Sequence, residues 1–325
     1  MPNRREFISC NVKAALALLT PVVDAHFWKY VRKEIKIGVI TDLHQDIMHD
    51  APKRLDSFLV AMDKVSPDAL LQLGDFAYPG EKNKVVIDRF NRAHEKVMHV
   101  IGNHDTDAGY TSAQCIAYWG MPGRYYHQRI GGISFLVLDG NEKGSPKDKG
   151  GYASYIGEEQ MAWLKAELEK TENPVIVVSH QPLAGELAID NAFEVQQLLS
   201  AHVGKILLAI NGHSHINASY HLDGVDYLHI NSASYFWVGE KFKHESYPKI
   251  ILDDHPWIAY TCPYRDALFA TLVIDPETQT VRVEGTQSEW VGDSPQTLGF
   301  EGMPDLKRGV QIAPSISSRK FAQHG

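Results

Sequence analysis

Seven side chains that can bind a metal ion stand in five short segments of the sequence, and each segment follows an apolar run. The donors are imidazole nitrogens and carboxylate or amide oxygens. A set without thiolates suits Mn, Fe or Zn better than a soft metal ion. The set predicts a two-metal hydrolytic site, and its members are Asp42, His44, Asp75, Asn103, His180, His213 and His215.

The spacing of two donor pairs gives a first expectation about which residues share an ion. In an extended backbone, residues two apart point to the same side. Asp42 and His44 are therefore expected to bind one cation together. His213 and His215 have the same spacing, and the same expectation applies to them.

In two further segments, the sequence predicts a separate role for each polar residue. Asn103 and His104 are adjacent and cannot easily bind the same ion, so we expect the amide oxygen to bind metal and the imidazole to face substrate. Asp75 follows Gly74, which lets the backbone turn, and it is the natural carboxylate bridge between two ions.

The elements that must position these residues are short apolar segments alternating with amphipathic ones. Unbroken apolar character indicates strands covered on both faces, and apolar residues at helical spacing indicate helices. We predict strands over residues 35–40, 69–73, 97–101, 133–138, 175–178 and 206–210, and helices over residues 52–65, 84–96, 158–170 and 192–201. Later strands with period two are predicted over 220–222, 227–230 and 268–274. The order predicts an α/β fold with two sheets and helices outside, with the donors at the carboxyl edge of parallel strands.

The five donor segments resemble the pattern of the calcineurin-like metallophosphoesterase superfamily: D-x-H, G-D, G-N-H-D/E, a lone histidine after a strand, and G-H-x-H. All five occur in this order between Ile37 and about Ile230. The resemblance implies a four-layer α/β/β/α sandwich and a dinuclear metal centre. It assigns one ion to Asp42, His44, Asp75 and His215, and the other to Asp75, Asn103, His180 and His213.

The same resemblance implies a reaction. Two ions about 3.5–4 Å apart would activate a bridging hydroxide that attacks a small phosphate mono- or diester, such as a nucleotide-like diphosphate or a cyclic nucleotide. His104 would protonate the leaving oxygen or steady its charge, and Asp105 would orient His104.

Two alternatives stay open. The segment from Asp75 to Tyr78 resembles the G-D-x-x-Y of purple acid phosphatases, in which a tyrosinate binds ferric iron. That family has glycine where this chain has His44, so we expect Tyr78 to lie in the pocket wall or the core. The other alternative is a non-catalytic scaffold on the same fold, and the presence of His104 with all seven donors favours the enzyme.

The composition and charge of the chain limit the classes of molecule that it is expected to bind. The chain is 44% hydrophobic and 22% charged, which is typical of a globular protein. Its formal charge is -8 and its basic residues are dispersed, so duplex nucleic acid is not the expected partner. No segment after the N-terminal region has the roughly 20 apolar residues that a membrane span needs. Cys115 and Cys262 could pair, but we expect buried thiols.

The two ends of the chain differ from the middle. Residues 3–8 resemble a twin-arginine export motif, and an apolar stretch and a small-residue cleavage site follow. We expect a signal peptide over residues 1–25 and export to the periplasm; the alternative is a cytoplasmic protein with an amphipathic N-terminal helix. The metallophosphoesterase domain is expected over residues 35–290. Residues 291–325 are expected to wrap the surface or to be mobile.

Substrate selection is expected from three segments around the metals. They are the loop 140–155, the aromatic run 235–237, and the insertion 244–266 with Trp257, Tyr260, Tyr264 and Arg265. Aromatic faces with an arginine could stack a base and pair with a distal phosphate, or the aromatic side chains could simply pack the loops. The remaining histidines, including His99 and His229, are expected on the surface or in satisfied core positions.

Overall fold

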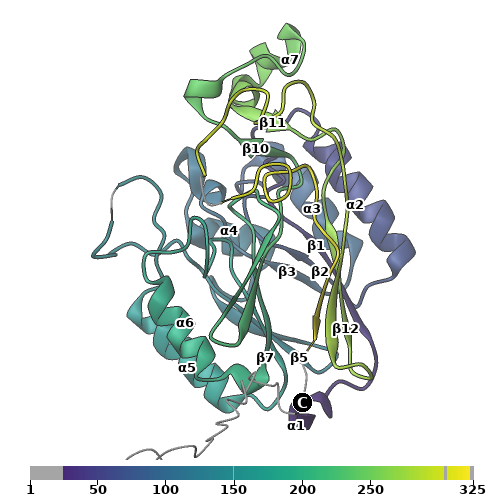
Figure 1. The fold of residues 1–325 in the computed structure, drawn as a ribbon, viewed down its shortest axis with the longest axis vertical. Helices are drawn as coiled ribbons and strands as arrows, with labels where there is room; N and C mark the ends of the chain where they lie inside the picture. The colour runs from purple at the N-terminus through teal and green to yellow at the C-terminus, as the bar shows by residue number, and fades with distance from the viewer. Residues whose placement is uncertain (1–24, 149, 304–305, 323–325) are drawn as a thin grey trace, which may run out of the picture.

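The computed structural model describes residues 25–148, 150–303 and 306–322 of the chain (Figure 1). The predicted signal segment 1–25 lies outside the described residues except for Ala25, which begins helix α1 (Ala25–Trp28). None of the described helices has the length and apolar character required to cross a membrane.

A first six-stranded sheet has the order β14-β13-β12-β1-β2-β3. Strands β1, β2 and β3 are parallel, whereas β12 is antiparallel to β1 and the remaining pairs of this sheet are antiparallel. The strands are β1 (Ile35–Ile40), β2 (Ala69–Gln72), β3 (Val97–His99), β12 (Ala270–Asp275), β13 (Thr280–Gly285) and β14 (Arg319–Ala322).

A second six-stranded sheet has the order β4-β5-β6-β7-β9-β8. Strands β5, β6, β7 and β9 are parallel, and the edge strands β4 and β8 are antiparallel to their neighbours. The strands are β4 (Tyr126–Ile130), β5 (Ile133–Val137), β6 (Val175–Val178), β7 (Ile206–Asn211), β8 (Ala218–Leu222) and β9 (Val225–His229).

The helices lie outside the two sheets. Figure 1 shows α2 and α3 on one side and α5 and α6 on the other. The longer helices are α2 (Ala51–Val65), α3 (Lys84–Ala93), α4 (Ser112–Trp119), α5 (Glu158–Lys170) and α6 (Ala192–Ser200). This arrangement confirms the predicted α/β fold with two sheets and outer helices.

Alternation along β6 explains why its whole length is apolar. Val175 and Val177 belong to a hydrophobic cluster with Leu164 of α5, whereas Ile176 and Val178 belong to a larger cluster that also contains side chains of the first sheet. Because successive strand residues point to opposite faces, one face of β6 packs on a helix and the other on the first sheet.

Several elements were not predicted from the sequence. They are β4, β13, β14, α4, the two-stranded sheet of β10 (Tyr235–Trp237) and β11 (Thr261–Pro263), α7 (Lys249–Asp254), and the 3₁₀ helices η1 (Glu81–Asn83), η2 (His104–Gly109), η3 (Val203–Lys205), η4 (Glu240–Phe242) and η5 (Pro256–Tyr260). The C-terminal segment does more than cover the surface, because β14 pairs with β13 and Ile316 is buried in the core. Cys115 and Cys262 are free and buried, as predicted.

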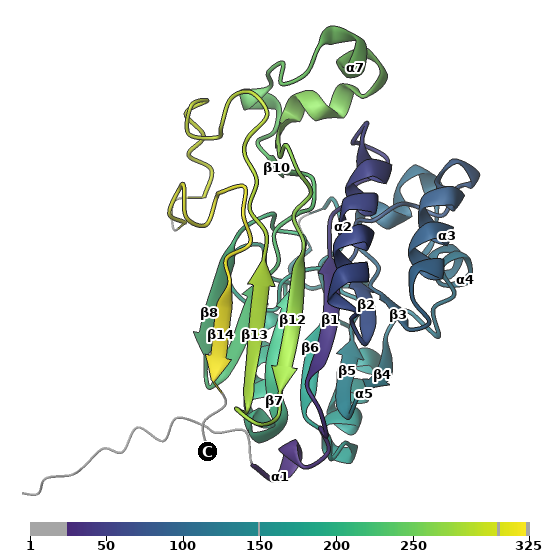
Figure 2. The ribbon, with the colours of Figure 1, turned by 90° about the vertical axis from the view of Figure 1, so that its right-hand side faces the viewer.

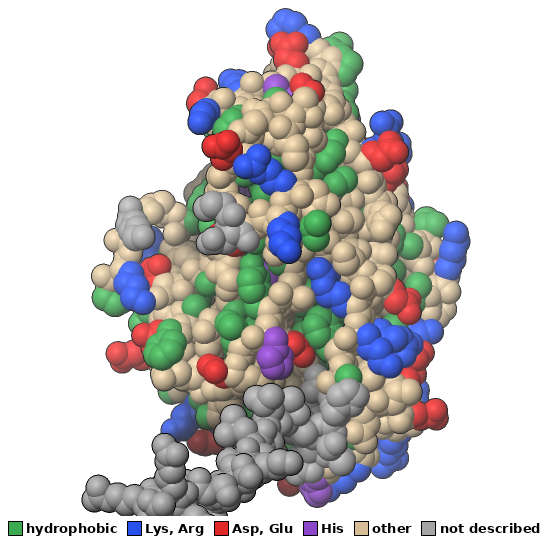
Figure 3. Space-filling model, in the orientation of Figure 1, with side chains coloured by type: hydrophobic (Ala, Val, Ile, Leu, Met, Phe, Trp, Pro, Cys, Tyr) green, Lys and Arg blue, Asp and Glu red, His purple; other side chains and the backbone are tan. Residues whose placement is uncertain are grey.

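The region beyond the carboxyl ends of the parallel strands carries the irregular segments. Figure 2 shows α7 and β10 above the two sheets at this end of the molecule. On the face shown in Figure 3, basic and acidic side chains are intermixed. Any site at the carboxyl ends of the parallel strands is therefore formed by loops that follow the strands.

Candidate metal centre

The seven predicted donors occupy the loops that follow five parallel strands. Hydrogen bonds between these loops hold them together: the Asp42 N–H donates to the Gly74 carbonyl over 3.0 Å, and the Gly212 N–H donates to the His180 carbonyl over 3.1 Å. The donors are Asp42 and His44 after β1, Asp75 after β2, Asn103 after β3, His180 after β6, and His213 and His215 after β7. Donors from both sheets thus meet at one edge.

Five of these donors have a left-handed backbone. This conformation is uncommon for residues other than glycine and costs roughly 1–3 kcal/mol, so surrounding contacts must hold it. The φ angles are 51° at Asp42, 49° at His44, 49° at Asp75, 66° at His213 and 51° at His215. The expectation that Asp42–His44 and His213–His215 are extended segments is therefore wrong.

Glycines in the motifs allow the loops to approach closely. A Cβ atom on Gly74, whose φ is 101°, would lie 2.5 Å from Nδ1 of His180. A Cβ atom on Gly102 would lie 2.2 Å from the backbone nitrogen of Asp75. Any larger residue would push the donor loops apart.

The first donor group consists of Asp42, His44 and His215. Nε2 of His215 lies 3.0 Å from Oδ1 of Asp42 and 3.3 Å from Nε2 of His44. All three side chains are buried.

The second donor group consists of Asp75, His180 and His213. Nε2 of His180 lies 3.2 Å from Oδ2 of Asp75 and 3.3 Å from Nδ1 of His213. The same Asp75 oxygen lies 3.8 Å from Nε2 of His44, so Asp75 faces both groups. His213 and His215 therefore lie in different groups, contrary to the expectation from their spacing and in line with the assignment implied by the family resemblance.

The donor atoms fit metal ions. Ligands about 2.0–2.1 Å from an ion, at tetrahedral or octahedral angles, stand about 2.8–3.4 Å from one another. The four separations of 3.0–3.3 Å given above fall in this range, whereas Nε2 of His44 and Oδ1 of Asp42 are 3.9 Å apart. Nδ1 of His180 bonds to the Leu73 carbonyl and Nδ1 of His215 to the Tyr235 carbonyl, each over 2.8 Å, which turns both Nε2 atoms toward the other donors. Oδ1 of Asn103 is buried without a hydrogen-bond partner, as expected for an amide oxygen that awaits a cation.

The electrostatics of the two groups also favour cations. Burial opposes ionisation of Asp42 and Asp75, but neighbouring histidines outweigh it, lowering the pKa of Asp42 to about 2 and that of Asp75 well below its usual value. Burial lowers the pKa of His44 and of His213 to about 3, which keeps these rings neutral. Burial also acts on His180, but Asp75 outweighs it and raises the pKa of this ring to about 9. The two carboxylates and the neutral rings of His44 and His213 are already in the ligand forms that metal ions require, whereas His180 would release a proton on binding a cation.

Asp107, and not Asp105, is the partner of His104. Nδ1 of His104 lies 2.8 Å from Oδ2 of Asp107. Asp75 and Asp107 outweigh the effect of burial and raise the pKa of His104 to about 9. The Tyr152 hydroxyl donates to Asp107 over 2.9 Å and lies 3.2 Å from Nδ1 of His104. Sequence reasoning missed Asp107, although its i+3 spacing is a detectable signal, and it missed Tyr152, which has no local signal.

The prediction that Asp105 orients His104 is wrong. The Asp105 carboxylate is buried and accepts hydrogen bonds from the backbone N–H groups of Gly102, Asp75, Phe76 and Ala77, over 2.7–3.1 Å. It therefore fastens the loop after β3 to the loop after β2 and fixes the backbone of two metal-donor segments.

A cavity of about 680 Å³ opens over the two groups. Tyr78 lies in its wall, as predicted, and stacks on Tyr110 with 5.2 Å between ring centres. The aromatic run 235–237 and Trp257 also line the cavity. Three residues expected there do not: Tyr260 stacks behind Trp237, Tyr264 is buried and donates to Asn231, and Arg265 pairs with Glu289 on the surface.

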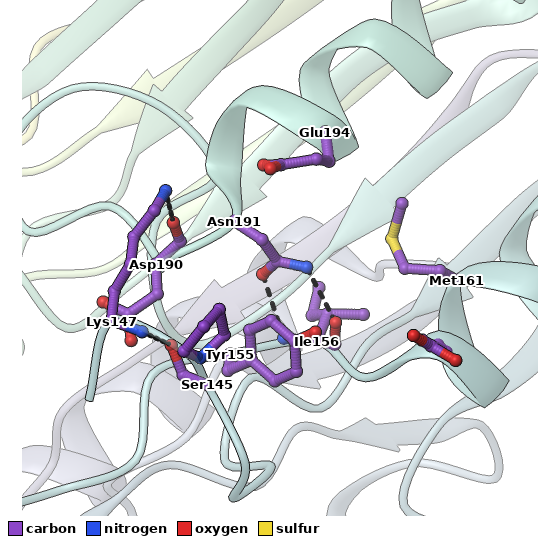
Figure 4. A pocket seen from close by; sticks show the side chains of 10 residues that line it. Ser145, Lys147, Tyr155, Ile156, Met161, Asp190, Asn191 and Glu194 are labelled. Carbon is purple, nitrogen blue, oxygen red and sulfur yellow. Dashed lines mark hydrogen bonds between the residues drawn. The ribbon is translucent and has the colours of Figure 1, made fainter.

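A second hollow of about 340 Å³ lies between the loop 140–155 and α6 (Figure 4). Its polar side chains already bind the segment just before α6: Nζ of Lys147 donates to the Asp190 carbonyl over 2.6 Å, and Asn191 exchanges two hydrogen bonds with the backbone of Ile156. Within the described part of the chain, the donor clusters lie at the larger cavity and not here.

Comparison with known proteins agrees with the geometry. Residues 35–217 match the model of the calcineurin-like phosphoesterase family. The chain belongs to this family. It is a metal-dependent hydrolase acting on phosphoester bonds, and the two donor groups support a dinuclear centre. No curated protein matches the chain.

Solved structures show the same fold at low sequence identity. A dimetal phosphatase from Danio rerio superposes with a TM-score of 0.55 and 16% identity, covering 79% of this calcineurin-like phosphoesterase and 98% of the other chain. GAP50, the anchor in the inner membrane complex of Plasmodium, superposes with a TM-score of 0.50 and 15% identity, covering 76% and 86%. The fold thus serves proteins with different roles, so the chemistry must be argued from the site.

Proposed function

We propose that this enzyme hydrolyses a phosphate mono- or diester with two bound cations, Mn, Fe or Zn, and a water-derived nucleophile between them. The observation that carries the proposal is the position of Asp75, whose Oδ2 faces Nε2 of His180 at 3.2 Å and Nε2 of His44 at 3.8 Å. One carboxylate oxygen between two donor groups is the arrangement of a bridging ligand. When bound, the two ions supply water activation and neutralise charge on the phosphoryl oxygens.

We assign the ions to two sets of residues that share Asp75. Asn103 joins the second set through its unpartnered amide oxygen. The proposed sets are Asp42, His44, Asp75 and His215 for one ion, and Asp75, Asn103, His180 and His213 for the other.

His104 is the proposed proton donor to the leaving oxygen. It lines the cavity beside the donor groups, and its ring lies 5.2 Å from that of His44. Because Asp107 binds Nδ1, the proton available for transfer is the one on Nε2. Tyr152, which binds both Asp107 and His104, limits rotation of the imidazole.

Turnover and metal content, measured on the same preparations, test the proposal. The purified protein is reconstituted with Mn and assayed with a chromogenic phosphodiester and a chromogenic monoester, and bound metal is counted by elemental analysis. We expect two ions per chain, turnover of at least one ester, and loss of both after chelation. A protein that binds two ions but hydrolyses neither ester at any pH would instead be a non-catalytic scaffold on this fold.

We also propose that residues 1–25 direct export of the folded enzyme to the periplasm, since Arg4 and Arg5 stand before an apolar stretch. Fractionation of cells that express the full chain and the double variant Arg4→Lys/Arg5→Lys tests this. Wild-type protein in the periplasm and the variant in the cytoplasm are expected; equal cytoplasmic retention of both would refute export.

A further inference from the structure

The cavity over the metal centre continues into a row of aromatic rings. The Tyr235 ring stacks on the metal-donor ring of His44 with 4.8 Å between centres, and Trp237 lies 6.4 Å beyond Tyr235. Tyr260 stacks on Trp237 at 5.7 Å and contacts Trp257 at 5.1 Å. An apolar surface therefore begins at the donor residues and leads outward.

Large, mostly apolar side chains around the cavity are exposed to solvent. Trp257 is 54% exposed, Tyr152 52%, Leu187 49% and Trp237 42%, and all four line the same cavity. Large apolar side chains left in contact with water around one concavity mark a binding surface.

The described side chains that line the cavity offer no cation to a second anionic group of a ligand, and two nearby lysines lie over aromatic rings: Nζ of Lys82 is 4.9 Å from the ring centre of Tyr78, and Nζ of Lys243 is 4.6 Å from that of Tyr260. Among the described residues, no lysine or arginine lines the cavity. The carboxylates there that are not metal donors already have partners: Asp46 pairs with Lys82 at 3.2 Å, and Asp107 binds His104 and Tyr152. Beyond the metal ions, a further phosphate or carboxylate would therefore meet apolar walls and occupied acidic groups.

We infer that the leaving group of the substrate is uncharged and flat or apolar, and that Trp237 and Trp257 bind it by stacking. This inference rests on the proposed function and deepens it, because it specifies a phosphate ester with one phosphoryl group and an aromatic or similarly apolar alcohol. It disfavours the nucleotide-like diphosphate considered from the sequence, since that substrate would place a second phosphate in this cavity. Stacking of a flat group on an indole face adds to the gain from burying its surface.

Binding of matched phosphonates to the manganese-loaded full chain tests the inference by calorimetry. Benzylphosphonate carries the flat apolar group, methylphosphonate lacks it, and phosphonoacetate replaces it with a charge; the methyl esters of the first two serve as diester analogues. We expect benzylphosphonate or its methyl ester to bind at least about tenfold more tightly than its methylphosphonate counterpart and than phosphonoacetate.

Two single variants, Trp237→Ala and Trp257→Ala, are expected to reduce this affinity ratio to below about threefold. Phe193→Ala is the matched control, because Phe193 is 63% exposed on α6 and does not line the cavity; it should keep the wild-type ratio. Thermal unfolding and metal content verify that each variant is folded and loaded.

The outcomes separate the inference from the function on which it rests. Equal affinities for the benzyl and methyl compounds, tighter binding of phosphonoacetate, or an unchanged ratio in both tryptophan variants would overturn the inference, and ester turnover would then still support the phosphoesterase. Absence of any phosphonate binding, together with absence of turnover by loaded protein, would overturn both.

Discussion

Two kinds of buried histidine occur in this protein, and their ring nitrogens distinguish them. In the core, His99 lies 2.7 Å from Oδ1 of Asn91 through Nε2 and 3.2 Å from Nε2 of Gln72 through Nδ1. At the metal centre, His180 bonds through Nδ1 to a backbone carbonyl, but its Nε2 faces Asp75 and another imidazole. Both side chains are buried, so burial alone does not identify a ligand.

The second core histidine follows the same rule as the first. Nδ1 of His229 lies 2.7 Å from the Ser214 hydroxyl, and its Nε2 lies 2.9 Å from the Ala184 carbonyl. His229 is therefore satisfied by protein atoms, although its partner Ser214 stands between two metal donors in the sequence. The comparison shows that a metal-binding histidine is recognised by a ring nitrogen that points at other metal donors. Closeness to the metal centre is not sufficient.

The largest expected effect comes from removing the shared carboxylate. Asp75→Asn replaces an anionic oxygen that faces both donor groups with a neutral amide, so we expect loss of bound metal and a fall in kcat/KM of at least about a hundredfold. Elemental analysis and ester hydrolysis measure the two effects on one sample. Asp63→Asn, on an exposed position of α2, is the control and should change neither. Retention of two ions by Asp75→Asn would show that Asp75 does not bridge them.

The next effect should separate catalysis from metal binding. His104 belongs to neither donor group, so His104→Ala is expected to keep both ions and to lower kcat by about a hundredfold or more. Metal analysis beside steady-state kinetics gives the comparison. If kcat were unchanged in a fully loaded variant, His104 would not be the proton donor.

A smaller effect is expected at the positioning residue Asp107. Asp107→Asn keeps a polar group near His104 but removes the negative charge, so we expect a decrease in kcat of about tenfold with little change in KM. His104 must be protonated to donate, and Asp107 helps to raise its pKa, so the alkaline limb of the kcat profile should also move to lower pH, which a purely structural role would not produce. Asp105→Asn is the informative comparison: because Asp105 holds four backbone N–H groups, its loss should lower stability and metal content instead.

Much of this site could be predicted from the sequence because its donors stand in short motifs after apolar strands. The strand cores were recognisable from runs such as Val175–Val178, which are apolar on both faces of β6. The types of donor and their order then led to two metal ions. These features depend on local sequence alone, which is why they were accessible.

What could not be predicted depends on contacts between distant loops. His213 and His215 belong to different groups, although their φ angles are left-handed like those of Asp42 and His44, which share one group. The division therefore depends on contacts with other loops, such as the hydrogen bond from the His213 N–H to Asp42. The choice between Asp105 and Asp107 as partner of His104 is likewise set by the backbone of η2, which departs from helical angles at Asp107 (φ -62°, ψ 170°). Arg265 was expected at the cavity on composition, but its pairing with Glu289 draws it away.

The smallest expected effect on activity is that of replacing the core histidine His99. This change is also the sharpest test of the comparison between core histidines and metal-centre histidines. Burial lowers the pKa of His99 to about 3, whereas an unfolded histidine titrates near about 6.5. Below about pH 6.5, His99 is protonated in the unfolded chain but stays neutral in the folded protein. The free energy of unfolding therefore falls by up to about 1.4 kcal/mol per pH unit between about pH 6.5 and pH 3. Above about pH 6.5, His99 makes no pH-dependent contribution. In His99→Gln this contribution is absent, and the free energy of unfolding should fall less steeply with acid while neutral-pH activity stays within about twofold of wild type.

Urea unfolding at pH 7.5, 6.0 and 5.0, with a chelator present, measures this slope without a contribution from metal binding. His221→Gln, whose side chain is 62% exposed, is the control and should leave the wild-type slope in place. An equal slope in His99→Gln and wild type would mean that His99 is protonated in the folded state. A protonated His99 would need a partner for its charge. His99 would then not be a neutral core ring satisfied by Asn91 and Gln72, and the distinction between core histidines and metal-centre histidines would be wrong.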